Sequence, residues 1–239
     1  MEHSHNYTNY YKTLYNDYRI PTHNEAYLVG IKNLYNFEPK VIYDIGSAVL
    51  HWTKFAKDIW PSSKIIAFEA VNEVKDFYDE YGIDYHLDVL GEIDNKEVLF
   101  YENPVYLGGN SYYKENSKYS IIADSIYGEE NQINRIMRTM DSVVQERGFP
   151  LPELIKIDVQ GCELDILKGM TKTLETVKHI IVELQIVEYN IGAKTVEESI
   201  PFIESLGFEL HPVDLINKDD KNPYFCGNGP DADYHFIRK

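Results

Sequence analysis

The chain has 239 residues, 44% of them hydrophobic, which is enough apolar material for one sizeable core. Its formal net charge of −16 repels polyanions, so we expect neither nucleic acid nor an anionic membrane surface as a partner. No apolar run reaches the roughly 18 residues of a membrane span, and the polar amino terminus is no signal peptide, so we expect a cytoplasmic protein.

Residues 1–38 are predicted to form a helical, tyrosine-rich extension ahead of a main domain at residues 39–239. Tyr7, Tyr11, Tyr15 and Tyr18 recur at spacings of three and four, which places them on one helix face. The simplest interpretation is a helix packed on the main domain. The alternative is a subunit contact, and hence a homo-oligomer, or a sugar-stacking surface, because tyrosine suits half-wet contacts.

From residue 39 the chain alternates strands and helices, the pattern of an α/β fold with buried parallel strands. Strands are predicted at 41–46, 64–70, 83–89, 97–102, 154–159, 179–185, 208–214 and 232–238, and helices at 52–60, 71–81, 163–175 and 195–206. The last two strands are joined by a loop without helical pattern, so we expect an antiparallel pair on an otherwise parallel sheet. With helices on both faces, this is the outline of a class I methyltransferase. Residues 103–140 are the least regular part and are interpreted as a lid or substrate loop.

Three strand ends carry acids that can bind a nucleoside cofactor. Asp44 and Gly46 end the first strand, and Ser47 follows in the turn. Glu69 ends the second strand, about 20 residues past that turn, where an acid can accept both hydroxyls of a ribose. Asp88 ends the third and can accept from an adenine amino group, although a solvated strand-end acid is an equal alternative.

The glycine pattern of the first turn argues against a dinucleotide. After Gly46 the sequence reads Ser-Ala-Val-Leu, so the G-x-G-x-x-G fingerprint that lets a pyrophosphate approach a helix amino terminus is absent. A cofactor with a ribose but no phosphate fits better. S-adenosylmethionine (SAM) is such a cofactor, and its amino and sulfonium groups suit an acidic cleft.

Residues 154–170 are the most distinctive stretch, a buried strand that delivers Asp158 to its carboxyl end before a tight turn and a helix. Its sequence resembles the I-K-I-D-V-E-G-x-E-x-x-x-L-K-G signature of the FkbM family of SAM-dependent methyltransferases, with Gln160 in place of the first Glu. The segments Asp44-Ile45-Gly46 and Phe68-Glu69 resemble the family's first two cofactor motifs. The similarity covers roughly residues 39–214. The other residues that match the signature are Lys156, Val159, Gly161, Glu163, Leu167, Lys168 and Gly169. Upstream, Thr139, Asp141 and Ser142 resemble a further family segment, T-L-D-S.

The first cofactor motif departs from the family pattern D-x-G-A-N-x-G. Ala48 replaces the Asn and Leu50 replaces the final Gly. A side-chain contact from position 48 to the methionine carboxylate is therefore missing. Our hypothesis is that backbone N–H groups, Ser47 or His51 compensate for it.

The resemblance implies an O-methyltransferase that acts on a hydroxyl of a sugar, glycan or polyketide. Such an enzyme aligns the hydroxyl with the activated methyl and removes its proton. Asp158 is the first candidate for this reaction face, and Glu183 on the next strand points to the same crevice. The two carboxylates can act as base and hydroxyl-positioner or share a divalent metal ion. Glu163 is expected to interact with the start of its own helix, and Cys162 is interpreted as a small buried thiol.

The glycine-, asparagine- and tyrosine-rich segment 106–119 contains Gly109 and Asn110, which we assign to the cofactor edge or to a sugar. An ordinary surface turn is the alternative. The histidines include no helical H-x-x-x-H pair, so a zinc site is not expected. Two other functions stay open: a nicotinamide-dependent oxidoreductase, and a cofactor-less interaction module.

Overall fold

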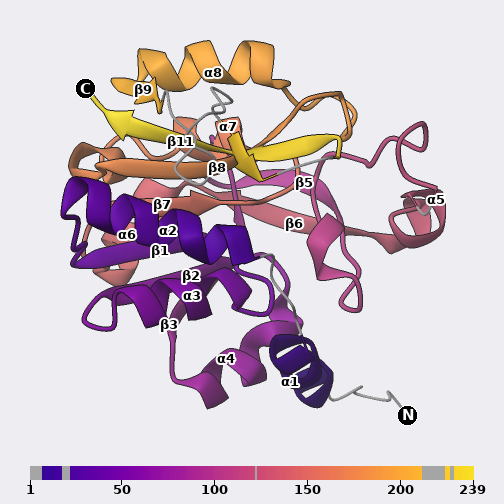
Figure 1. Ribbon diagram of the computed structural model, residues 1–239. Helices are drawn as coiled ribbons and strands as arrows, with labels where there is room; N and C mark the ends of the chain where they lie inside the picture. The colour runs from indigo at the N-terminus through magenta and orange to yellow at the C-terminus, as the bar shows by residue number, and fades with distance from the viewer. Residues whose placement is uncertain (1–6, 18–21, 122, 212–223, 227–228) are drawn as a thin grey trace.

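The computed structural model describes residues 7–17, 22–121, 123–211, 224–226 and 229–239 (Figure 1). Its main sheet has eight strands in the order β10-β11-β8-β7-β1-β2-β3, with β9 paired to β11. Neighbours from β8 to β3 run parallel, whereas β11 is antiparallel to β8, β9 and β10. The strands are β1 Val41–Ile45, β2 Lys64–Glu69, β3 Asp84–Leu87, β7 Leu154–Ile157, β8 His179–Gln185, β9 Phe208–Leu210, β10 Tyr224–Cys226 and β11 Asp231–Arg238. The predicted class I methyltransferase fold, with its antiparallel carboxyl-terminal strands, is thus confirmed.

Alternating side chains of the buried strands supply two separate cores. Ile42 of β1 packs with α2 (Thr22–Tyr35) and α3 (His51–Ile59), whereas Tyr43 faces the other side of the sheet. That second core includes apolar residues of α6 (Met140–Arg147), α7 (Glu163–Lys168) and α8 (Val196–Ser205). Helices therefore cover both faces, as predicted (Figure 1).

A second sheet of three strands corrects part of the prediction. It has the order β4-β6-β5, with β4 Val89–Leu90 parallel and β5 Lys96–Tyr101 antiparallel to β6 Gln132–Arg138. The strand predicted at 97–102 is thus no part of the parallel sheet, and the strand predicted at 83–89 is split between the two sheets at Asp88. On β5, Phe100 is buried whereas Leu99 is 53% exposed, the alternation of a half-covered antiparallel sheet rather than of a buried parallel strand.

The segment 103–140 is also more regular than predicted. Besides β6 it contains α5 (Ala123–Ile126) and the 3-10 turns η2 (Leu107–Gly109) and η3 (Glu129–Asn131). The helix predicted at 71–81 consists of η1 (Asn72–Val74) and α4 (Lys75–Tyr81), and the one predicted at 163–175 stops at Lys168 and is followed by η4 (Thr173–Thr176). The strand predicted at 208–214 ends at Leu210, and residues 212–214 lie outside the described part of the chain. Within the described residues, no helix has both the length and the apolar character that crossing a membrane requires.

The first helix, α1 (Tyr7–Asp17), packs on the main domain. The Tyr11 ring is buried, and its edge meets Phe77 of α4 with centroids 6.1 Å apart. Tyr15 contacts Tyr81 at 4.5 Å. The tyrosine face therefore serves packing, as the simpler interpretation predicted, while Tyr18 lies outside the described residues.

Candidate functional site

A cavity of about 430 Å³ opens at the carboxyl ends of β1, β2 and β7. This is the edge of a parallel sheet at which ligands bind in open α/β folds. Gly109 and Glu183 are not among the described residues that line it. The other seven predicted site residues do line it: Asp44, Gly46, Ser47, Glu69, Asp88, Asn110 and Asp158.

Asp44 is fixed at the end of β1. Its side chain is buried, and its Oδ2 accepts a hydrogen bond of 2.5 Å from the hydroxyl of Thr53 on α3. Desolvation raises the pKa of Asp44 to about 6, although Thr53 and the Lys156 ammonium oppose the shift. The carboxylate is therefore held rigidly at the cavity wall.

The turn after β1 is shaped by contacts within the protein. Gly46 has a φ of +81°, and a Cβ at this position would lie 1.8 Å from the carbonyl oxygen of Asp158. The glycine is thus needed for the approach of another backbone, not only of a ligand as the sequence indicated. The Ser47 hydroxyl donates to the Phe68 carbonyl at 3.1 Å and lies 2.9 Å from the Tyr78 hydroxyl, so it joins the turn to β2 and α4.

Glu69 lies at the end of β2 and receives three backbone hydrogen bonds. Its Oε2 accepts from the Ala48 N–H at 2.9 Å, and its Oε1 accepts from the N–H groups of Ala70 and Val71 at 2.8 and 3.1 Å. Burial raises the pKa of Glu69, and the three N–H donors partly offset this. The carboxylate is oriented: both lone pairs of Oε1 are used by the backbone, and Oε2 keeps one for a hydroxyl donor.

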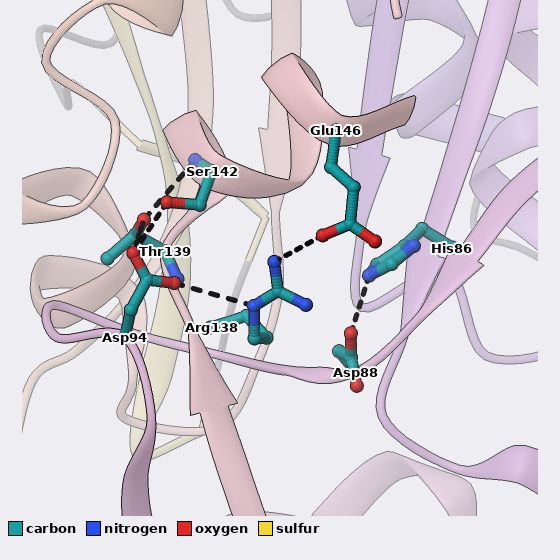
Figure 2. Close-up of polar contacts among 7 residues, drawn as sticks. All are labelled: His86, Asp88, Asp94, Arg138, Thr139, Ser142 and Glu146. Carbon is teal, nitrogen blue, oxygen red and sulfur yellow. Dashed lines mark hydrogen bonds and ion pairs between the residues drawn. The ribbon is translucent and has the colours of Figure 1, made fainter. Parts of the chain in front are cut away.

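Asp88 lies between β3 and β4 and is held by His86. The His86 Nε2 and the Asp88 Oδ2 are 2.7 Å apart (Figure 2). Because Asp88 lines the cavity and one of its oxygens contacts His86, its other oxygen is the one placed to accept from a ligand.

The family-like segment at residues 139–142 has a structural place beside this pair. Thr139 caps α6, and Asp94 accepts hydrogen bonds from the Thr139 N–H, the Thr139 hydroxyl and the Ser142 hydroxyl at 2.9, 2.9 and 2.5 Å (Figure 2). Asp141 accepts from the backbone of Lys172 and Thr173 at 2.9 and 2.8 Å. These contacts join the loop before β5 and the end of α7 to α6.

In the same view Arg138 of β6 lies between two acids. Its guanidinium is 2.6 Å from Glu146 of α6 and 3.5 Å from Asp94 (Figure 2). All three side chains are partly exposed, so the pairs contribute little individually. None of the three lines the cavity.

A buried ammonium lies among the carboxylates at the end of β7. The Lys156 Nζ is 2.6 Å from Asp233 of β11 and 3.2 Å from Asp158. Although burial opposes it, these carboxylates raise the pKa of Lys156 above its usual range. Lys156, Asp158 and Asp233 all line the cavity.

The pKa values of the two predicted catalytic acids, Asp158 and Glu183, are shifted in opposite directions. Desolvation alone would raise the pKa of Asp158, but the Lys156 ammonium and side-chain hydrogen bonds from Glu183, Lys156 and Gln160 together keep that pKa below its usual range. Burial and the nearby Asp158 charge raise the pKa of Glu183 well above its usual range. The Asp158 carboxyl is therefore ionised at neutral pH, whereas burial disfavours the charged form of Glu183.

The same acids are the candidate ligands for a divalent metal ion. One carboxylate oxygen from each of Asp158, Glu183 and Asp233 lies within 4.8 Å of the others. The Lys156 ammonium already contacts two of these carboxylates and supplies the compensating positive charge. The donor set thus fits an internal cation better than a metal ion, and no step is assigned to a metal.

The turn after Asp158 is held from several sides. Gln160, with a φ of +56°, donates from Nε2 to Glu183 at 2.9 Å. Glu163 accepts from the Gly161 N–H at 3.0 Å, which agrees with its predicted interaction at the start of its own helix. Cys162 is buried, and desolvation raises the pKa of its thiol to about 12, as expected for a structural cysteine.

The segment 106–119 lies against this turn. The Ser111 hydroxyl donates to the Gln160 carbonyl at 2.8 Å, and Tyr112 lines the cavity. Asn110 also lines it, but its side-chain amide is bonded to the backbone of Asn103 at 2.7 and 3.2 Å. A Cβ at Gly109 would meet the Tyr127 ring at 2.2 Å, so this glycine serves packing.

Sequence reasoning missed several lining residues. Lys156 and Asp233 could have been found together, because a lysine inside a wholly apolar strand needs a buried acid as partner. Leu14 and Phe100 carry no local signal, since only the tertiary fold brings α1 and β5 to the cavity.

Known proteins resemble this chain in sequence and in fold. A sequence model of the Methyltransferase FkbM domain matches residues 40–210. The chain is 31% identical over 88 residues to the hexuronic acid methyltransferase AglP of Haloferax volcanii, which covers 37% of this chain and only 31% of that relative. The plantazolicin methyltransferase BamL, solved with a triazolic desmethylPZN analog and SAH, superposes with a TM-score of 0.53 at 8% identity, over 97% of this chain and 90% of that one. The last likeness concerns the fold alone.

Proposed function

This chain belongs to the FkbM methyltransferase family, and we propose that it is a SAM-dependent O-methyltransferase whose acceptor is a hydroxyl of a sugar or glycan. The observation that carries the proposal is that one cavity is lined both by Glu69, an acid placed to bind a ribose, and by the ionised acid Asp158. The groups needed to bind the cofactor and to remove the acceptor proton therefore lie in the same cavity.

The charge of the cavity supports SAM as the cofactor. Among the described residues that line it, Lys156 is the sole lysine or arginine, and it is engaged by Asp158 and Asp233. The acids Asp44, Glu69 and Asp88 are left to face a ligand. SAM carries a sulfonium and an ammonium, so an acidic cavity without a free cation favours it over a pyrophosphate cofactor. Glu69 would accept from a ribose hydroxyl on Oε2, and Asp88 would accept from the adenine amino group.

The chain's own residues then have two tasks. When bound, SAM supplies an activated methyl group, and the protein aligns the acceptor oxygen with it. As the acceptor oxygen takes the methyl group, the methyl–sulfur bond would break and S-adenosylhomocysteine would leave, while the hydroxyl proton passes to the ionised Asp158 carboxylate. Glu183 accepts a hydrogen bond of 2.9 Å from the Gln160 side-chain amide and lies within 4.8 Å of the Asp158 carboxylate, so it can help to orient that carboxylate.

A sugar acceptor is supported by one relative and by the walls of the cavity. AglP is named a hexuronic acid methyltransferase, and the match covers a third of its length. Tyr112 lines the cavity, and an aromatic side chain suits contact with a sugar ring.

Calorimetry on the purified chain tests the cofactor. We expect S-adenosylhomocysteine (SAH) to bind and NAD not to. Glu69→Ala should weaken SAH binding roughly 10- to 100-fold, the loss expected for a charge-assisted hydrogen bond. Glu97→Ala, an exposed acid on β5, is the matched control and should leave the affinity unchanged.

Two results would reverse the proposal. Binding of NAD but not SAH would favour the nicotinamide-dependent oxidoreductase. Binding of neither would favour a cofactor-less interaction module. If SAH binds, transfer of a labelled methyl group to a panel of free sugars and glycosides, with matched non-sugar alcohols, identifies the acceptor class.

A further inference from the structure

Helix α1 precedes the matched family segment 40–210, yet its residue Leu14 lines the cavity. We infer that α1 is a wall of the cofactor site and that Leu14 contacts the bound cofactor. This inference rests on the proposed function, and it adds a binding element from outside the family domain.

The helix is anchored firmly enough to serve as a wall. Tyr11 is fully buried and packs its ring against Phe77. Tyr15 meets Tyr81 at 4.5 Å, and Lys12 forms an ion pair with Glu80. Burial of an aromatic side chain is among the larger contributions that one residue makes to packing. The face of α1 that carries the tyrosines is therefore fixed on α4.

The same helix contacts the start of α3 beside the cofactor turn. The His51 Nε2 donates to the Leu14 carbonyl at 3.1 Å, and the Tyr15 ring lies nearly parallel to the His51 ring, 6.5 Å away. His51 and Leu14 both line the cavity. His51 directly follows Ala48–Leu50, where the sequence departs from the family motif, so α1 supports the turn at its altered part.

Helix α1 is also tied to the segment that leads into η2. The Tyr11 hydroxyl donates to the Pro104 carbonyl at 2.8 Å, and the Tyr10 hydroxyl donates to the Val105 carbonyl at 3.1 Å. Leu107 and Gly108, a few residues later, line the cavity. The helix thus contacts two segments that bound the cavity, and Leu14 and Leu107, which both line it, pack on the same apolar cluster around Phe77.

Two substitutions of Leu14 in the full chain test this position. Leu14→Trp adds bulk that would enter the cavity, and Leu14→Ala removes the apolar contact. We expect SAH binding, measured by calorimetry, to weaken at least about 10-fold for Leu14→Trp and about 3- to 10-fold for Leu14→Ala. Leu34→Ala on α2, where the side chain is 59% exposed and does not line the cavity, is the control and should bind as the wild type.

The melting temperature without ligand separates binding from folding. If Leu14→Trp fails to fold, Leu14→Ala decides alone, because a leucine truncated at a cavity wall leaves the aromatic anchors intact. Wild-type affinity for SAH in a folded Leu14→Ala variant overturns the inference while leaving the proposed function intact. Absence of SAH binding by the wild type instead overturns the proposed function, and the inference with it.

Discussion

Gly46 and Asp158 are in direct backbone contact, because a Cβ on Gly46 would lie 1.8 Å from the carbonyl oxygen of Asp158. The two residues end adjacent parallel strands, and the Asp158 N–H donates to the Ile45 carbonyl at 2.9 Å. The first cofactor turn and the turn that presents the candidate base are thus built as one unit. Their relative position is set by backbone packing rather than by a side chain.

Gly46→Ala should therefore be severely destabilising. The added methyl group cannot avoid a backbone carbonyl, and the φ of +81° is itself unfavourable for alanine. We expect a loss of roughly 3 kcal/mol or more in the free energy of unfolding, measured by urea denaturation. Gly148→Ala is the control, because Gly148 has a φ of +64° with open space around it and should lose only about 1 kcal/mol. Equal losses in the two variants would contradict the contact.

Asp158→Ala should separate chemistry from cofactor binding. We expect SAH affinity within about 10-fold of the wild type and turnover reduced roughly 100-fold or more, the contribution usual for a general base. Asp124→Ala, an exposed acid on α5 that does not line the cavity, should keep full turnover. Near-normal turnover of Asp158→Ala would reject the catalytic role, and loss of SAH binding alone would assign the residue to the cofactor.

The main sheet could be predicted because its strands are short apolar runs separated by helical patterns. Ile155 and Ile157 of β7 belong to an unbroken buried stretch that only a parallel interior strand explains. The second sheet could not be predicted in the same way. The chain changes sheet at Asp88, inside one predicted strand, and β6 pairs with β5 across a long connecting segment.

The site was predictable where one residue type at a strand end carries the signal. Asp44, Glu69 and Asp158 are such residues, and all three line the cavity. Gly109 looked like a site residue because of its composition, yet it packs on Tyr127. Contributions such as Leu14 depend on how α1 docks, and no local pattern records that.

The stability of the protein should depend on pH through Glu163. Burial raises the pKa of this carboxyl from about 4.5 to about 7 in the folded state, although backbone N–H groups oppose the shift. An acid with a raised folded-state pKa contributes stability that is complete below pH 4.5 and is lost as the pH rises through about 7.

Glu163→Gln removes this titration and keeps an oxygen for the Gly161 N–H. We expect the variant to gain stability relative to the wild type as the pH rises from about 5 to about 8, by at most roughly 3 kcal/mol. Urea denaturation at several pH values measures the difference. Glu197→Gln, an exposed residue on α8, should show no such trend, and a flat difference for Glu163→Gln would contradict the buried carboxyl.

Ala48 adopts a φ of +42° at the position where the family motif has Asn. Asparagine tolerates this left-handed conformation better than alanine, and a β-branched residue tolerates it worst. We therefore expect Ala48→Asn to stabilise the protein by about 0.5 to 1 kcal/mol and Ala48→Val to destabilise it by a larger amount, in urea denaturation without ligand. The Ala48 N–H donates to Glu69 and its carbonyl accepts from Tyr78, so both variants keep these backbone contacts.

Calorimetry with SAH then tests whether the missing asparagine matters for the cofactor, because Ala48 lines the cavity. Unchanged SAH affinity in a stabilised Ala48→Asn variant would show that the turn needs asparagine for its backbone conformation and not for a ligand contact.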